Sequence, residues 1–138
     1  MSYVEKCLFE YKANIAALEV LQSEINNLKS IHVQSYQEIN RSNSNSDPVL
    51  NTVSQAMELE KKIARLEKKI KPINKLIMDL SSGKSLYIRQ LRDILTLKYI
   101  GHEDNHYIQE EMCVSVSTYW RRVRELLRIA RKYFGKIE

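Results

Sequence analysis

The chain has 138 residues, of which 43% are hydrophobic and 28% charged, and its formal net charge is +5. This size suits one domain, or one small domain with a helical appendage. Helix-forming residues dominate and no segment alternates apolar with polar residues, so the sequence predicts an all-α protein and excludes a β-sheet protein.

The sequence carries no mark of export or membrane insertion. No apolar run approaches the roughly 20 residues of a membrane span, and the polar N-terminus lacks the apolar core of a signal peptide. Cys7 and Cys113 lie far apart and form no CxxC pair, which is typical of reduced thiols. We therefore expect a cytoplasmic protein with no membrane partner.

Apolar residues recur in steps of three and four from residue 3 to residue 32, which predicts a first amphipathic helix there. The stripe consists of Leu8, Tyr11, Ile15, Leu18, Leu21, Ile25, Leu28 and Ile31. Residues 40–47 are polar and rich in asparagine and serine, so we expect a mobile linker. Asp47 is the expected N-cap of the next helix and Pro48 its first residue.

A second helix is predicted from Pro48 to Leu80, because its apolar residues follow a heptad for about three and a half repeats. They are Ala56, Leu59, Ile63, Leu66, Ile70, Ile73, Ile77 and Leu80. Pro72 lies inside this pattern, and since the register continues through it we expect a kink and not a break. After the helix, Gly83 fits a left-handed cap and Ser85 fits the N-cap of a third helix.

The C-terminal segment predicts a helix over 86–100, a loop over 101–105, a short helix over 106–112 and a long helix over 115–134. The last two have the layout of a helix-turn-helix. We therefore divide the chain into an N-terminal helical oligomerisation or coiled-coil region, 1–82, and a helix-turn-helix DNA-binding domain, 83–138. The expected core between the two last helices is Ile108, Met112, Val114, Tyr119, Val123, Leu126 and Ile129 or Ala130.

Positive charge is concentrated in the last helix. Residues 120–138 hold seven bases and two acids. Their net charge of +5 equals that of the whole chain. Such a local excess is typical of a surface that binds a polyanion, here double-stranded DNA. The plain alternative is a solvated helix face.

Within the predicted helix 115–134, we expect some residues to contact DNA bases and others to contact the DNA backbone. The first turns of such a helix reach base edges, and the predicted base contacts are Ser117, Thr118, Arg121 and Arg122. The predicted contacts to the DNA backbone are Ser115, Trp120, Arg124, Arg128, Arg131 and Lys132. Ser115 is also the expected N-cap, and Trp120 either packs on the first helix of the unit or stays partly exposed over the sugar-phosphate backbone.

Residues 107–122 resemble the helix-turn-helix of sigma-factor region four. The matches are Ile108, Glu110, Met112, Val114, Ser115, Ser117, Thr118, Trp120, Arg121 and Arg122. Residues 91–101 look like the preceding helix of the same unit. Gln109 replaces a small residue of the pattern, and Cys113 replaces the turn glycine, where a left-handed backbone is expected.

The overall layout, with Ser46-Asp47-Pro48 and the segment 119–122, is similar to phage late-gene transcriptional regulators of the RinA/ArpU type. That resemblance implies a sequence-specific regulator of packaging and morphogenesis genes in a bacterial host cell. Its N-terminal helices would assemble an oligomer, with a dimer favoured by the clean heptad, or contact RNA polymerase. The two stripes can also cover each other within one chain.

Two other functions fit the same segments. A small terminase subunit also joins a helix-turn-helix to an oligomerising helical region, and it forms a ring of many copies. A coiled-coil adaptor of RNA polymerase could use the region-four-like unit without binding DNA. Low-salt duplex affinity and measured mass separate these possibilities.

Three short patterns point weakly to other chemistry. Residues 102–106 formally match the HExxH zinc-protease signature but read as a polar loop, and 83–85 resemble the end of a phosphate-binding loop but follow a helix. Cys113 is expected to be a small buried apolar residue. No catalytic residues stand out, so we expect no enzyme, no cofactor and no metal site.

Overall fold

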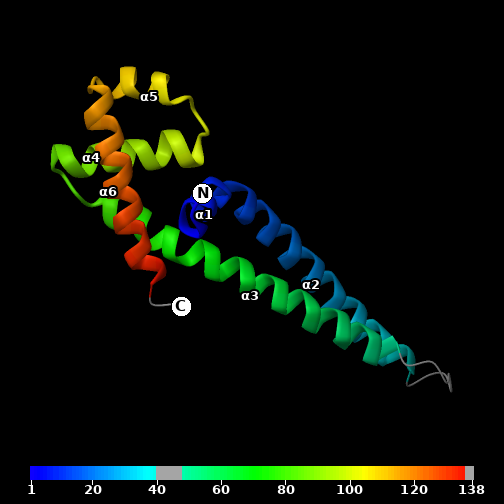
Figure 1. The fold of residues 1–138 in the computed structure, drawn as a ribbon. Coiled ribbons are helices and arrows are strands. Elements are labelled where there is room, and N and C mark those ends of the chain that lie inside the picture. The colour runs from blue at the N-terminus through cyan, green and yellow to red at the C-terminus, as the bar shows by residue number, and fades with distance from the viewer. Residues whose placement is uncertain (40–47, 136–138) are drawn as a thin grey trace. The chain divides into compact units, whose positions relative to one another are not determined.

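A computed structural model describes the backbone of residues 1–39 and 48–135 and the side chains of 1–30 and 53–135. These ranges contain six α-helices, one short π-helix and no strand, which confirms the all-α prediction (Figure 1). None of the described helices is both long and apolar enough to cross a membrane. The linker 40–47 and the predicted N-cap Asp47 lie outside the described residues.

The chain divides into two units, and the division differs from the boundary expected at 82/83. The first, here called the core unit, joins residues 1–14 to residues 68–138, and the second, the hairpin unit, is 15–67. The helix-turn-helix therefore shares its unit with the first helix of the chain and with the end of the long second stripe. Periodicity finds an apolar stripe but does not show which partner covers it.

The first predicted helix is two helices in the structure. Helix α1 spans Tyr3–Phe9 and α2 spans Tyr11–Ile39, with Glu10 between them at φ −90° and ψ 1°. Hydrogen bonding continues across the junction, because the Glu10 N–H donates to the Lys6 carbonyl and the Glu10 carbonyl accepts from the Asn14 N–H. The junction therefore costs little in backbone hydrogen bonds.

Helix α3 spans Pro48–Ser81 and continues through Pro72, as expected. The turn after it corrects one prediction, since no glycine of the described residues has a positive φ. A Cβ at Gly83 would lie 2.4 Å from Ile88 Cγ2, so glycine is needed for close approach and not for a left-handed cap. Ser85 caps α4 as predicted, because its hydroxyl accepts a hydrogen bond of 3.2 Å from the Ile88 N–H.

The predicted helix 86–100 changes its winding part-way. Helix α4 spans Leu86–Ile94, and a π-helical segment, η1, continues from Leu95 to Ile100. The Gly101 N–H closes η1 on the Thr96 carbonyl at 2.8 Å. Helices α5, Asn105–Met112, and α6, Val116–Phe134, follow within one residue of their predicted bounds.

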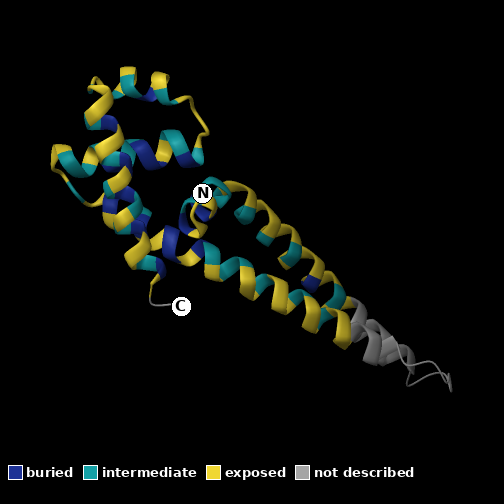
Figure 2. Cartoon of the chain, viewed as in Figure 1, coloured by how far each residue is buried: buried dark blue, intermediate teal, exposed yellow. Residues whose placement is uncertain are grey.

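The core unit has one continuous apolar interior, drawn in dark blue in Figure 2. Its buried residues come from every helix of the unit: Val4, Cys7, Leu8, Ile73, Leu76, Leu80, Leu91, Ile94, Leu95, Tyr99, Ile108, Tyr119, Val123, Leu126, Ala130 and Phe134. Leu8 is fully buried, and the Phe9 ring lies 4.6 Å from the Tyr99 ring, centroid to centroid. Helix α1 is thus a structural part of the helix-turn-helix unit.

The hairpin unit consists of α2 from residue 15 onward and α3 up to residue 67, lying side by side (Figure 1). Its predicted stripes face inward only in part. Among the described side chains of this unit Ile25 alone is buried, and the other apolar stripe residues are half-buried.

Candidate nucleic-acid interface

The connection between α5 and α6 has the geometry of a tight helix-turn-helix. Asp104 caps α5 by accepting a hydrogen bond of 3.1 Å from the His106 N–H. Cys113 then takes the left-handed backbone conformation expected of it, with φ 56° and ψ 44°. Ser115 caps α6 as predicted, accepting from the Thr118 N–H at 3.2 Å. The two caps and the left-handed residue fix where each helix begins and ends.

Cys113 is exposed, so the prediction of a buried apolar side chain was wrong. Its left-handed backbone turns the side chain out of the core, and its Sγ lies 3.5 Å from the Glu110 carbonyl oxygen as a hydrogen-bond donor. Cys7, in contrast, is buried. Cys7 is 2% exposed, and burial raises the pKa of its thiol.

The core between the two helices is close to the predicted one. The fully or nearly fully buried members are Ile108, Tyr119, Val123, Leu126 and Ala130. The three others pack against them while staying partly exposed: Met112, Val114 and Ile129. Of the two alternatives left open by the sequence, Ala130 is therefore the buried residue.

Buried phenols tie this core together. The Tyr119 hydroxyl donates to Asn105 Oδ1 at 2.5 Å, and Lys98 Nζ donates to the same oxygen at 2.7 Å. Burial raises the pKa of Tyr119 to about 12. The Tyr99 hydroxyl donates to Glu5 Oε2 at 3.1 Å, and burial raises the pKa of Tyr99 as well. These bonds join α1, η1, α5 and α6.

One face of α6 is lined with arginine. Its residues follow each other in steps of four and three, lie opposite the buried positions and are all exposed: Ser117, Arg121, Arg124, Arg128 and Arg131. We call this set the arginine face. Its four guanidinium groups occupy about 15 Å of helix at 1.5 Å per residue. Lys132 is exposed beside its end.

Arg122 does not lie on that face. Its side chain is 19% exposed, its Nε donates to Gln90 Oε1 at 2.8 Å, and its Nη1 lies 3.2 Å from Glu125 Oε2. The guanidinium carbon is 4.9 Å from the centre of the Tyr87 ring. Because successive residues of a helix point about 100° apart, the neighbour of an outward-facing arginine is turned against α4. Arg122 is thus engaged within the chain, in contrast to Arg121.

Trp120 is 37% exposed, as one of the two sequence interpretations expected. Its ring makes an edge contact with Tyr119, with centroids 5.1 Å apart, and the Lys98 ammonium lies 5.2 Å from its centre. Lys98 lies at similar distances from two further rings, those of Phe9 and Tyr99. Desolvation by this cluster lowers the pKa of Lys98. Trp120 is therefore held in one orientation with an edge open to solvent.

The remaining predicted contacts lie at the start of α6. Ser115 and Ser117 are exposed, and Thr118 is half-buried. The Ser115 hydroxyl donates to Thr118 Oγ1 at 2.9 Å and lies 3.3 Å from Ser117 Oγ. Thr118 is therefore part of the cap, and Ser117 is the more open of the two predicted base contacts.

The HExxH-like segment is a loop followed by a helix, as expected. His102 precedes α5 with a φ of 56°, whereas His106 is in α5 and its Nε2 lies 3.0 Å from Glu110 Oε1. Among the described residues no three His, Cys, Asp or Glu side chains lie close enough together to hold a metal ion.

No protein-family model, curated protein or solved structure matches this chain.

Two exposed apolar residues near the turn were not singled out from the sequence. Val116, the first residue of α6, is 60% exposed, and Tyr107 of α5 is 44% exposed. Both are absent from the expected core and from the predicted DNA contacts, because periodicity does not show which apolar residue of a first turn stays exposed. Val116 adjoins Ser117, which begins the arginine face, so an apolar contact is available beside the charged one.

Proposed function

We propose that the protein is a sequence-specific DNA-binding transcriptional regulator that places α6 in the major groove of duplex DNA. The observation that carries this proposal is the arginine face. Four arginines on the exposed side of one helix, directly after a capped left-handed turn, form a positive surface that matches the polyanionic duplex.

The chemistry of the face divides along α6. Arg121 lies near the start of α6, where a guanidinium can donate two hydrogen bonds to guanine O6 and N7. Arg124, Arg128 and Arg131 lie further along and are suited to phosphates, which add affinity without sequence information. Arg122 takes no part in this proposal, because breaking its contacts to Gln90 and Glu125 would oppose any gain on DNA.

The resemblance to phage late-gene regulators extends the proposal to biological role. On that basis the protein controls late genes of a phage or prophage, acting in the cytoplasm of a bacterial host. The same resemblance leaves RNA polymerase as a second partner of the regulator. Neither extension is needed for duplex binding itself.

Fluorescence anisotropy with a generic labelled duplex over a salt series tests the proposal, since no operator has to be known. The Arg121→Ala/Arg124→Ala variant should bind at least about tenfold more weakly, because each phosphate or base contact contributes on the order of 1 kcal/mol. Its affinity should also fall less steeply with salt. Lys12→Ala/Lys29→Ala is the matched control, since it removes two exposed positive charges from α2.

The control should bind as the parent does. Equal binding by parent and arginine variant would show that the arginine face is not the DNA surface. Absence of parent binding even at low salt would replace the proposal with the RNA polymerase adaptor. Circular dichroism of each variant should match the parent, because the replaced side chains are exposed.

A further inference from the structure

The described part of the hairpin unit lacks a closed interior of its own. Among its described side chains only Ile25 is buried, at 6% exposure. The heptad residues of α3 up to Leu66 are all half-buried, as are the α2 stripe residues Ile15, Leu18, Leu21 and Leu28. Helices in proteins depend mainly on covering such an apolar face, so this pair of stripes is incompletely satisfied within one chain.

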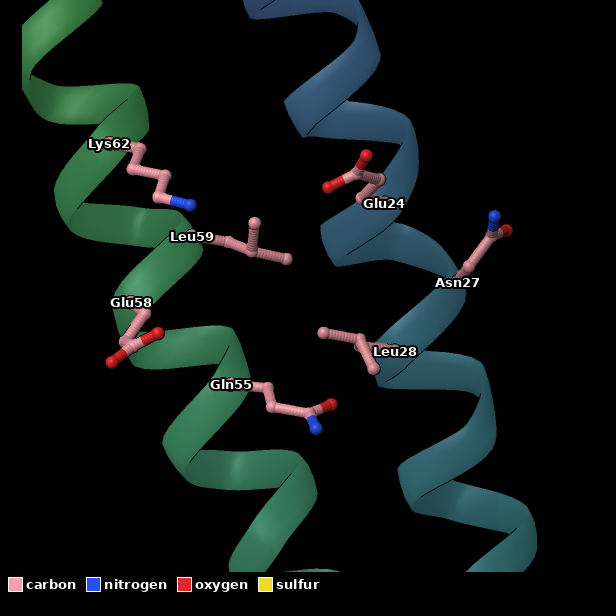
Figure 3. A pocket seen from close by; sticks show the side chains of 7 residues that line it. All are labelled: Glu24, Asn27, Leu28, Gln55, Glu58, Leu59 and Lys62. Atoms are coloured by element: carbon pink, nitrogen blue, oxygen red, sulfur yellow. The ribbon is translucent and has the colours of Figure 1, made fainter.

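The incompletely covered seam opens as a groove between the two helices. It has a volume of about 390 Å³, and Leu28 and Leu59 point toward one another across it (Figure 3). Glu24 and Lys62 lie at one end of these leucines and Gln55 at the other, while Glu58 lies beside them on α3. The groove thus has an apolar floor and a polar rim, the anatomy of a protein–protein interface.

Charges on the rim have both signs. Glu24 and Glu58 are exposed acids of the groove, and Lys62 is an exposed base. A second depression on the same stretch of α3 is lined by Glu58, Lys61, Lys62 and Arg65. A face that mixes acids and bases in this way does not suit DNA or a uniformly charged protein. It suits a partner with the same mixture, because acids of one copy can face bases of the other.

From these observations we propose that the groove face of the hairpin unit binds the same face of a second copy of this chain. Two hairpins would then form a four-helix bundle with Leu28 and Leu59 of each copy in its interior.

The size of the face agrees with this occupant. Residues 53–67 of α3 form about 22 Å of helix, and two adjacent helices are roughly 20 Å wide, so this part of the face covers about 450 Å². Specific interfaces bury about 600–1,000 Å² on each partner, so the described part of the face supplies most of the area of a small one.

Molar mass in solution tests the proposal without DNA, so its outcome is independent of duplex binding. Light scattering or sedimentation equilibrium of the parent should give twice the 16.3 kDa of one chain over a micromolar concentration series. A monomer throughout that series would overturn the proposal. A mass well above two copies would also overturn it, because the self-complementary face closes with two.

Charge variants locate the interface on the rim. Lys62→Glu/Arg65→Glu gives a chain with an acidic rim, and Glu24→Lys/Glu58→Lys gives one with a basic rim. All four replaced side chains are exposed, so each variant should keep its helicity. Each alone should dimerise about tenfold or more weakly, because like charges now meet across the interface. Lys84→Glu/Arg89→Glu, with the same charge change in the core unit, is the matched control and should remain dimeric.

Mixing the acidic-rim and basic-rim chains is the decisive step, since opposite rims should restore a dimer containing one of each. A mixture that stays monomeric would show that the rim residues do not face one another between copies. Dimerisation of both variants at the parent affinity would overturn the proposal in the same way.

Discussion

The Leu8→Ala substitution should destabilise the core unit by about 2–5 kcal/mol, the usual cost of truncating a buried leucine. Leu8 belongs to α1 and is fully buried among residues of the helix-turn-helix unit. Native domains are stable by only about 5–15 kcal/mol, so this loss is a large fraction of the total. If the helix-turn-helix unit began at residue 83, truncating Leu8 would not destabilise it.

Urea denaturation followed by tryptophan fluorescence measures this loss directly, because the single tryptophan, Trp120, lies in the core unit. With a slope of about 2 kcal/mol/M, the midpoint should fall by roughly 1–2.5 M. Leu21→Ala, at a half-buried position of the hairpin unit, is the control and should shift the same transition much less. The reasoning is refuted if Leu8→Ala unfolds within about 0.5 kcal/mol of the parent, as a surface substitution would.

Two further predictions concern particular side chains. Cys113→Gly should raise the unfolding free energy by about 1 kcal/mol, because only glycine adopts a left-handed conformation without a steric penalty; a lower melting temperature would contradict this. Tyr119 has a pKa of about 12 in the folded chain against an ordinary value of 10, so its contribution to stability is complete below pH 10 and is lost as the pH rises through 12. The Tyr119→Phe variant has no phenol to ionise, so its unfolding free energy should fall less than that of the parent between pH 10 and pH 12. Parallel curves of unfolding free energy against pH for parent and variant would contradict this prediction.

Sequence reasoning worked well where a local rule determines the structure. Hydrophobic spacing located α3, α5 and α6 within one residue of their bounds. Ser85 and Ser115 were found as N-caps because a serine before an apolar run has one favourable role. The left-handed conformation of Cys113 followed from the glycine that its position normally holds.

Features that depend on a distant partner were beyond sequence reasoning. Arg121 and Arg122 have identical side chains and adjacent positions, and only the placement of Gln90 and Tyr87 on α4 decides which of them faces solvent. The division into units also depends on distant partners, and it differs from the expected boundary at 82/83 for that reason. The apolar stripe at the end of α3 has the same spacing whether it pairs with another hairpin or, as Ile73 and Leu80 do, completes the interior of the core unit.

The contact between the first and last helices has a consequence for the kinetics of folding. The Tyr3 ring lies 6.1 Å from the Phe134 ring, and Val4 and Phe134 are buried in the same core, so both ends of the described chain contribute to it. At a synthesis rate of about 5–20 residues per second, α1 waits on the order of ten seconds for α6 to be made. Contacts of such large sequence separation also slow the search for the native state. The nascent chain therefore holds the side of α1 that packs on α6 uncovered until α6 has been made, and we expect chaperones to matter most during that interval.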